Sequence, residues 1–183
     1  MACLVILFTV GLLIGEKFEK WFVQRLNDSL KARVEIAEVS FSLLRNFPHA
    51  GIRLTNVKAY NAKDYPEPGL LLQAEHIDFT FSLVGLISGD YAIEKAILKN
   101  AKLQLLQDKD GKTNYDIFIA SDSAQGNQKF QFDINTIKVE NTEFFFNDYS
   151  VDFVFATRIE TCKFSGQFSS ERYQMTAAGD VFV

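Results

Sequence analysis

The sequence predicts a mainly β protein with a helical segment at its amino terminus. Beyond Val34, most of the chain alternates apolar and polar residues with a period of two. This alternation is typical of antiparallel sheets with one apolar face and one wet face. Residues 1–15 carry no charge, and residues 16–32 place apolar side chains at every fourth position. The second pattern predicts an amphipathic helix that continues from the uncharged segment.

Composition and charge exclude several classes of protein. The chain has 183 residues, of which 48% are hydrophobic and 23% charged, which predicts one folded domain or a domain with an appendage. A net charge of −4 argues against nucleic-acid binding, which needs a basic face. Two cysteines (Cys3, Cys162) and two histidines (His49, His76) cannot build a disulfide framework or a zinc site. The sequence therefore predicts neither a metal site nor a cofactor.

No motif predicts an enzyme. Acidic residues such as Asp148 and Glu160 stand in no acid–base arrangement, and no serine or histidine lies in a nucleophile-elbow context. The run from Asp108 to Asn114 resembles a calcium loop, but Thr113 occupies the position that requires glycine. A hairpin turn is the better interpretation of that run.

The amino terminus predicts a membrane anchor. A spanning helix needs about 20 apolar residues, and residues 1–15 reach that length only with Phe18, Trp21, Phe22 and Val23, while Lys17 and Lys20 snorkel. The alternative is a buried core helix. Since no basic residue precedes the apolar run, we expect the natural product to begin upstream of Met1 with Lys or Arg, and the chain to be a fragment.

The remaining pattern predicts nine strands and their connections. The strands are expected at residues 34–41, 51–59, 71–83, 93–106, 129–139, 142–148, 151–159, 162–168 and 172–178. Turns are expected at 63–69, 108–111, 140–141, 149–150 and 169–171, a short helix at 83–88, and a linker or long loop at 120–128. The predicted organisation is an anchor and helix (1–32), a first β-repeat region (33–119), the linker, and a truncated second β-repeat region (129–183).

An internal repeat accompanies the strands. Residues 52–59, 96–103 and 137–144 share a string of apolar and polar positions, with asparagine at the same place in each: Asn56, Asn100 and Asn141. Asparagine tolerates the left-handed backbone region and bonds its own backbone. The repeat therefore predicts the same bend or bulge three times.

The chain is rich in phenylalanine, with 18 residues of this type. Residues two apart on a strand share a face, so one side of one antiparallel sheet should hold Phe130, Phe132, Phe144, Phe146, Phe153 and Phe155. Burial of apolar surface stabilises a fold by about 25 cal/mol per Å², so this face needs a cover. A second sheet, a neighbouring repeat or acyl chains could each cover it. The strand pattern alone therefore does not exclude the alternative fold, a closed β-sandwich.

The ordered segments SLLRNFP (42–48), IRLTNV (52–57), LKNA (98–101) and DGKTNY (110–115) resemble the amino-terminal region of AsmA-family proteins. The likeness runs from Leu12 to Phe118, and residues 137–148 and 166–169 resemble the repeats that follow. It implies an inner-membrane anchor and a periplasmic body whose twisted antiparallel sheet forms an open apolar groove.

The resemblance also implies a function. Family members act in outer-membrane biogenesis and phospholipid traffic, so this chain is expected to handle phospholipid or another acyl lipid along its groove. The six phenylalanines above are the candidate groove residues. The implied location is the inner membrane of a Gram-negative bacterium, single-pass, with the β-body in the periplasm and with outer-membrane or periplasmic proteins as partners. The alternative is a membrane-tethered structural β-domain for protein–protein interaction.

Overall fold

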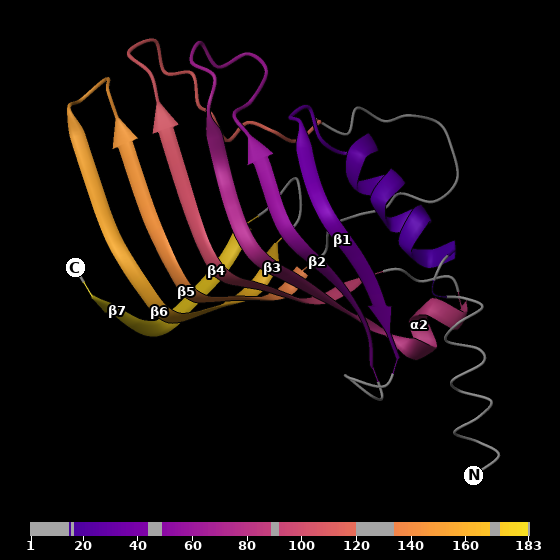
Figure 1. Ribbon diagram of the computed structural model, residues 1–183. Coiled ribbons are helices and arrows are strands. Elements are labelled where there is room, and N and C mark those ends of the chain that lie inside the picture. The colour runs from indigo at the N-terminus through magenta and orange to yellow at the C-terminus, as the bar shows by residue number, and fades with distance from the viewer. Residues whose placement is uncertain are drawn as a thin grey trace, which may run out of the picture.

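A computed structural model describes residues 15, 17–43, 49–88, 92–119, 134–168 and 173–182. Seven strands form one sheet whose spatial order follows the sequence (Figure 1). They are β1 (Val34–Ser42), β2 (His49–Tyr60), β3 (Leu70–Ser82), β4 (Ile93–Gln107), β5 (Ile134–Asp148), β6 (Phe153–Phe168) and β7 (Tyr173–Phe182). An amino-terminal helix (residues 17–28) and α2 (Leu83–Ser88) complete the described elements. The mainly β prediction, the amphipathic helix and the short helix at 83–88 are confirmed.

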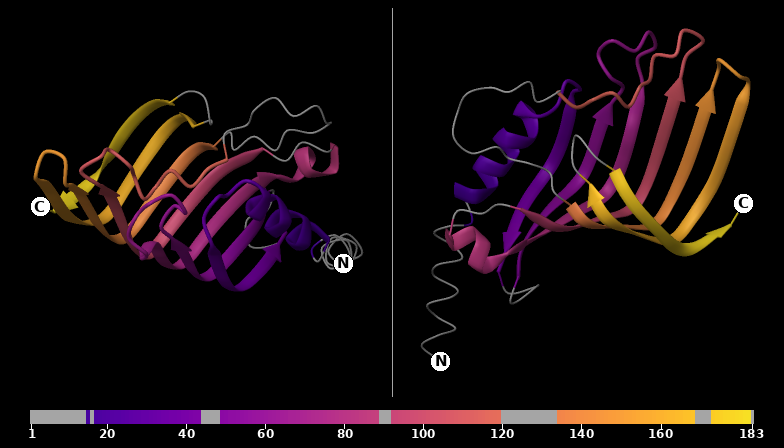
Figure 2. Two further views of the ribbon diagram at one scale, coloured as in Figure 1. Left: turned by 90° about the horizontal axis from the view of Figure 1, so that it is seen from above. Right: turned by 180° about the vertical axis from the view of Figure 1, so that it is seen from behind.

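The sheet is open. Its two edges are β1 and β7, and the amino-terminal helix lies over one face at the β1 side (Figures 1 and 2). The described strands all belong to this one sheet, so the alternative of a closed β-sandwich is wrong for the described part of the chain.

The prediction of a wholly antiparallel sheet is also wrong. Strands β4 and β5 run parallel, in a register that extends from Lys95 opposite Thr136 to Gln107 opposite Asp148. A parallel pair needs a long connection that returns to the starting end of the sheet, and residues 108–133 supply it. Period-two alternation is the same for both strand directions, so the sequence pattern could not distinguish them.

Two pairs of predicted strands are each one strand. The expected turn at Glu140-Asn141 does not exist, because β5 runs unbroken from Ile134 to Asp148, and β6 likewise joins the segments predicted at 151–159 and 162–168. The turn at Tyr149-Ser150 is confirmed between them. The predicted linker at 120–128 and the turn at 169–171 lie outside the described residues.

The repeated asparagines mark a line of bends across the sheet. Asn56, Asn100 and Asn141 have φ angles of 51°, 48° and 44°, which confirms the predicted bend. The strand register contains no pair at the asparagine itself: on the two sides of Asn56, for example, Thr55 pairs with His76 and Val57 pairs with Ala74. No extra residue is inserted, because the register keeps the same offset on both sides; the asparagine in the left-handed region turns its strand and reverses the alternation of side chains. Apolar residues three apart therefore stay on the same face, as in the pairs Leu54/Val57, Leu98/Ala101 and Val139/Thr142, where Thr142 is a buried polar member.

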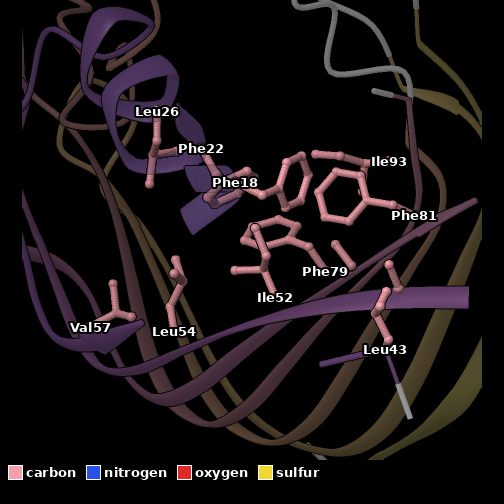
Figure 3. Packing of buried hydrophobic residues seen from close by; sticks show 12 residues of the cluster. Phe18, Phe22, Leu26, Leu43, Ile52, Leu54, Val57, Phe79, Phe81 and Ile93 are labelled. Atoms are coloured by element: carbon pink, nitrogen blue, oxygen red, sulfur yellow. The ribbon is translucent and has the colours of Figure 1, made fainter. Parts of the chain in front are cut away.

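The core lies between the amino-terminal helix and the first four strands (Figure 3). Phe18, Phe22 and Leu26 are buried on one helix face, as their spacing predicts. The Phe22 ring packs 5.2 Å from that of Phe79 and 5.9 Å from that of Phe81, and Phe18 packs 5.3 Å from Phe81. Within the described residues, no helix has both the length and the apolar character that a membrane crossing requires.

Candidate functional site

The sheet face under the helix continues as an apolar surface onto the strands that the helix does not reach. Directly paired residues lie on the same face of a sheet, so the register traces this surface strand by strand. One row runs from Leu54 through Ile77, Leu98 and Val139 to Cys162. We call this surface the inner face; beyond the line of bends its further rows contain Ala74, Ala101, Leu72, Leu103, Leu105, Thr142, Phe144, Phe146, Thr157, Phe155 and Phe153.

Four of the six predicted phenylalanines lie together on the inner face. Phe146 pairs directly with Phe155 across β5 and β6. The rings of Phe144 and Phe155 are 6.1 Å apart, as are those of Phe146 and Phe153, both in tilted contacts. Phe130 and Phe132 lie outside the described residues.

Burial changes along the inner face. Under the helix, Leu54 and Phe81 are fully buried. On β4 to β6 the side chains of Leu103, Leu105, Phe144, Phe146 and Phe155 are only half-buried, and Phe153 is 50% exposed. Among the described elements, no helix or strand other than the amino-terminal helix lies over this face (Figure 2). The structure thus presents a continuous apolar surface that its own helix covers at one side.

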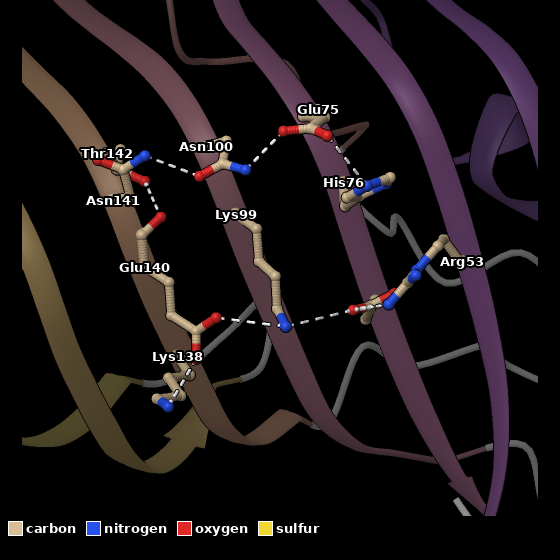
Figure 4. A network of polar contacts seen from close by, with 10 residues as sticks. Arg53, Glu75, His76, Lys99, Asn100, Lys138, Glu140, Asn141 and Thr142 are labelled. Atoms are coloured by element: carbon tan, nitrogen blue, oxygen red, sulfur yellow. Dashed lines mark hydrogen bonds and ion pairs between the residues drawn. The ribbon is translucent and has the colours of Figure 1, made fainter. Parts of the chain in front are cut away.

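The opposite face is charged (Figure 4). Arg53 binds Asp78 through two hydrogen bonds of 2.6 and 2.9 Å, and Lys99 lies 4.0 Å from Asp78 and 3.2 Å from Glu140. Lys138 lies 2.6 Å from the other Glu140 oxygen. Hydrogen bonds from Lys138 and Lys99 lower the pKa of Glu140, and the Asp78 hydrogen bond raises the pKa of Arg53. Lys99 thus belongs to a network in which basic and acidic side chains pair with one another.

The line of bends carries its own row of polar contacts on that face. Asn141 donates from Nδ2 to Oδ1 of Asn100 at 2.7 Å, and Arg158 donates to Oδ1 of Asn141 at 3.0 Å. Asn100 in turn donates to Glu75. These contacts join β3, β4, β5 and β6 and leave the inner face apolar.

Comparison with protein-family models gives a match to the AsmA family over residues 15–179. The chain belongs to the AsmA family. The match begins at the amino-terminal helix and ends within β7, so it includes every described part of the inner face. Comparisons with curated proteins and with solved structures give no significant match.

One buried polar residue of this AsmA-family chain was not predicted from the sequence. Asn114, fully buried, accepts from Leu106 N at 2.8 Å and donates to the Gln104 carbonyl at 2.8 Å and to Asn61 at 3.0 Å. It fixes the segment that leaves β4 and reaches the end of the helix, where Lys31 N donates to the Ile117 carbonyl. The sequence signals only a polar residue after a turn, and nothing local indicates its burial.

The calcium-like run is a turn, as predicted. Asp108 Oδ1 accepts from the backbone N–H groups of Asp110 and Lys112, and Gly111 adopts a φ of 81°. Among the described residues, no group of three or more histidine, cysteine, aspartate or glutamate side chains is placed to hold a metal ion.

Proposed function

We propose that this AsmA-family chain is a membrane-anchored periplasmic protein that binds phospholipid or another acyl lipid along its inner face and acts in outer-membrane biogenesis. The observation that carries the proposal is the half-exposed apolar surface on β4 to β6, which contains Phe144, Phe146, Phe153 and Phe155. Membership of the AsmA family supports it.

The chemistry of the two sheet faces suits a lipid. An acyl chain laid across the phenylalanines would remove apolar area from water at about 25 cal/mol per Å². The bends keep mainly apolar side chains on this face on both sides of the asparagines, while charges such as Lys99 and Glu140 stay on the other. A lipid on the inner face would therefore lie over a mainly apolar floor, with the charged residue Asp148 at the strand end, where it pairs with Phe153.

The proposal requires no chemical step. Lipid binding and passage depend on burial of apolar surface and on exchange with membranes, so we propose no catalytic residue and no cofactor. The partners we propose are the inner membrane, an acyl lipid, and outer-membrane or periplasmic proteins that exchange lipid with the chain.

A second candidate is a membrane-tethered structural β-domain for protein–protein interaction. It is favoured by large apolar side chains at the turn between β5 and β6, where Tyr149, Val151 and Val154 are 41%, 69% and 59% exposed. A protein that docks at this turn would cover them without any lipid on the inner face.

Lipid extraction and mass spectrometry of the protein purified in mild detergent separate the two candidates. We expect wild type to retain phospholipid and Phe155→Glu to lose most of it while remaining folded, because a carboxylate at an open groove reaches water. Phe145→Glu is the matched control, since Phe145 lies on the same strand as Phe144 and Phe146 but on the opposite face. Unfolding of Phe155→Glu, with no lipid recovered from wild type, would contradict the proposal and favour a dry core.

A further inference from the structure

The short helix α2 presents two apolar side chains to solvent. Val84 and Ile87 are 76% and 77% exposed, the highest values among the large exposed apolar side chains of the described residues. They stand three positions apart, so they share one helix face. The helix sequence, LVGLIS, contains no charged residue.

The rest of α2 holds this apolar pair in place. Leu83 and Leu86 pack against the core cluster that includes Phe18 and Phe81. The Ser82 hydroxyl accepts a hydrogen bond from Gly85 N at 3.1 Å and closes the first turn. Val84 and Ile87 are therefore presented outward by a helix whose inner side is fixed to the core.

The position of α2 identifies what the pair would meet. Phe18, in the first turn of the amino-terminal helix, contacts Phe81 at 5.3 Å, and α2 begins two residues after Phe81. Figures 1 and 2 show α2 and the start of that helix at the same end of the sheet. The chain enters this helix from the uncharged residues 1–15, and Lys17 and Lys20 follow at once.

We propose that α2 is a second membrane contact, with Val84 and Ile87 inserted into the interfacial layer of the bilayer that holds residues 1–15. An apolar helix face at an interface is buried some 5–10 Å, to the boundary of headgroups and acyl chains. Two contacts at one end of the sheet would fix the orientation of the β-body on the membrane, which a single flexible anchor would not. The inference rests on the membrane anchor in the proposed function.

Site-specific fluorescence in proteoliposomes tests this contact. Ile87→Cys, in a chain that also carries Cys3→Ser and Cys162→Ala, is labelled with an environment-sensitive dye. The full chain is then reconstituted into phosphatidylethanolamine–phosphatidylglycerol vesicles. We expect a blue-shifted emission that is quenched by lipids spin-labelled near the headgroup. Val151→Cys in the same background is the matched control, because Val151 is 69% exposed but lies at the opposite end of the strands; its emission should remain that of a dye in water.

Other outcomes overturn the inference in distinguishable ways. A water-like dye at residue 87, in protein that resists carbonate extraction, would reject the α2 contact and leave the anchor and lipid binding intact. Protein released by carbonate would reject the anchor and the α2 contact together. A blue-shifted but unquenched dye would place α2 against another protein copy instead of lipid. Emission of Trp21, the single tryptophan, verifies that each labelled variant keeps its helix packing.

Discussion

At the scale of single residues, the asparagines in the line of bends have backbone angles that favour them over other side chains. When a residue that has a Cβ atom adopts left-handed backbone angles, the folded state is destabilised by about 1–2 kcal/mol. Asparagine reduces this cost through local hydrogen bonds. Since Asn141 has a φ of 44°, we expect Asn141→Ala to lower the free energy of unfolding by about 1–2 kcal/mol. Asn141→Gly should cost less, because glycine accepts a positive φ. Urea unfolding followed by circular dichroism in mild detergent measures both.

A neighbouring position supplies the control for this prediction. Glu143 is exposed on the same strand, and its φ is not among the positive values. Glu143→Ala should therefore change stability by no more than about 0.5 kcal/mol. Equal effects at 141 and 143, or a larger loss with glycine than with alanine, would show that the positive φ contributes nothing.

Glu140 predicts a dependence of stability on pH. Its hydrogen bonds with Lys138 and Lys99 lower its pKa below the ordinary value of 4.5. A carboxylate with a lowered folded-state pKa stabilises the protein above its unfolded pKa, and this contribution disappears as pH falls through the folded pKa. Glu140→Gln should therefore be less stable than wild type at pH 7, and the difference should shrink on acidification below about pH 4.5. A difference that stays constant down to pH 3 would contradict the charge-based origin of the effect.

At the scale of elements, the amino-terminal helix owes its position to a few buried aromatic side chains. Phe22 is fully buried against Phe79 and Phe81. Truncation of a buried phenylalanine to alanine costs about 3–5 kcal/mol, so Phe22→Ala should release the helix or unfold the domain. Gln24→Ala, two residues on at an exposed position, should be nearly neutral. Thermal unfolding and Trp21 fluorescence would compare the pair, and similar melting temperatures for both variants would mean that the helix is held elsewhere.

The same helix protects an edge of the sheet. Glu19 accepts a hydrogen bond from the backbone N–H of Phe41 at 2.6 Å. An edge strand with free N–H groups is a template for unwanted pairing. The helix thus covers part of the inner face and also accepts a hydrogen bond from one backbone N–H group of β1.

Sequence patterns predicted the elements better than their connections. Period-two alternation located all seven strands, and the spacing of Phe18, Phe22 and Leu26 located the helix, because both depend on which residues face the core. The unbroken course of β5 through Asn141 was missed, since asparagine followed by a polar residue signals a turn as well as a bend. The parallel pairing of β4 with β5 was missed because alternation carries no direction, and the role of Asn114 because burial of a polar residue depends on the tertiary fold.

At the scale of the whole molecule, the two faces of one curved sheet differ in polarity, and the proposed lipid binding belongs to only one of them. The inner face offers apolar area, and the opposite face carries charges that are largely paired with one another. The start of the amino-terminal helix and α2 lie at one end of the sheet, and the exposed turn of β5 and β6 lies at the other (Figure 1). A membrane at the α2 end would thus leave the open part of the inner face and the turn at Tyr149 directed away from the bilayer.

This orientation leads to a prediction of topology. Lys17, Lys20 and Arg25 follow the apolar segment, and taken alone such residues favour a cytoplasmic location for their side of the membrane. Large folded domains, however, cross largely regardless of their charge, and the proposed function requires a periplasmic β-body. We expect carboxyl-terminal fusions of the chain to give active alkaline phosphatase and a dark green fluorescent protein, since the former matures only outside the cytoplasm. The reverse pattern, bright fluorescence with inactive phosphatase, would place the inner face in the cytoplasm and exclude exchange with the outer membrane.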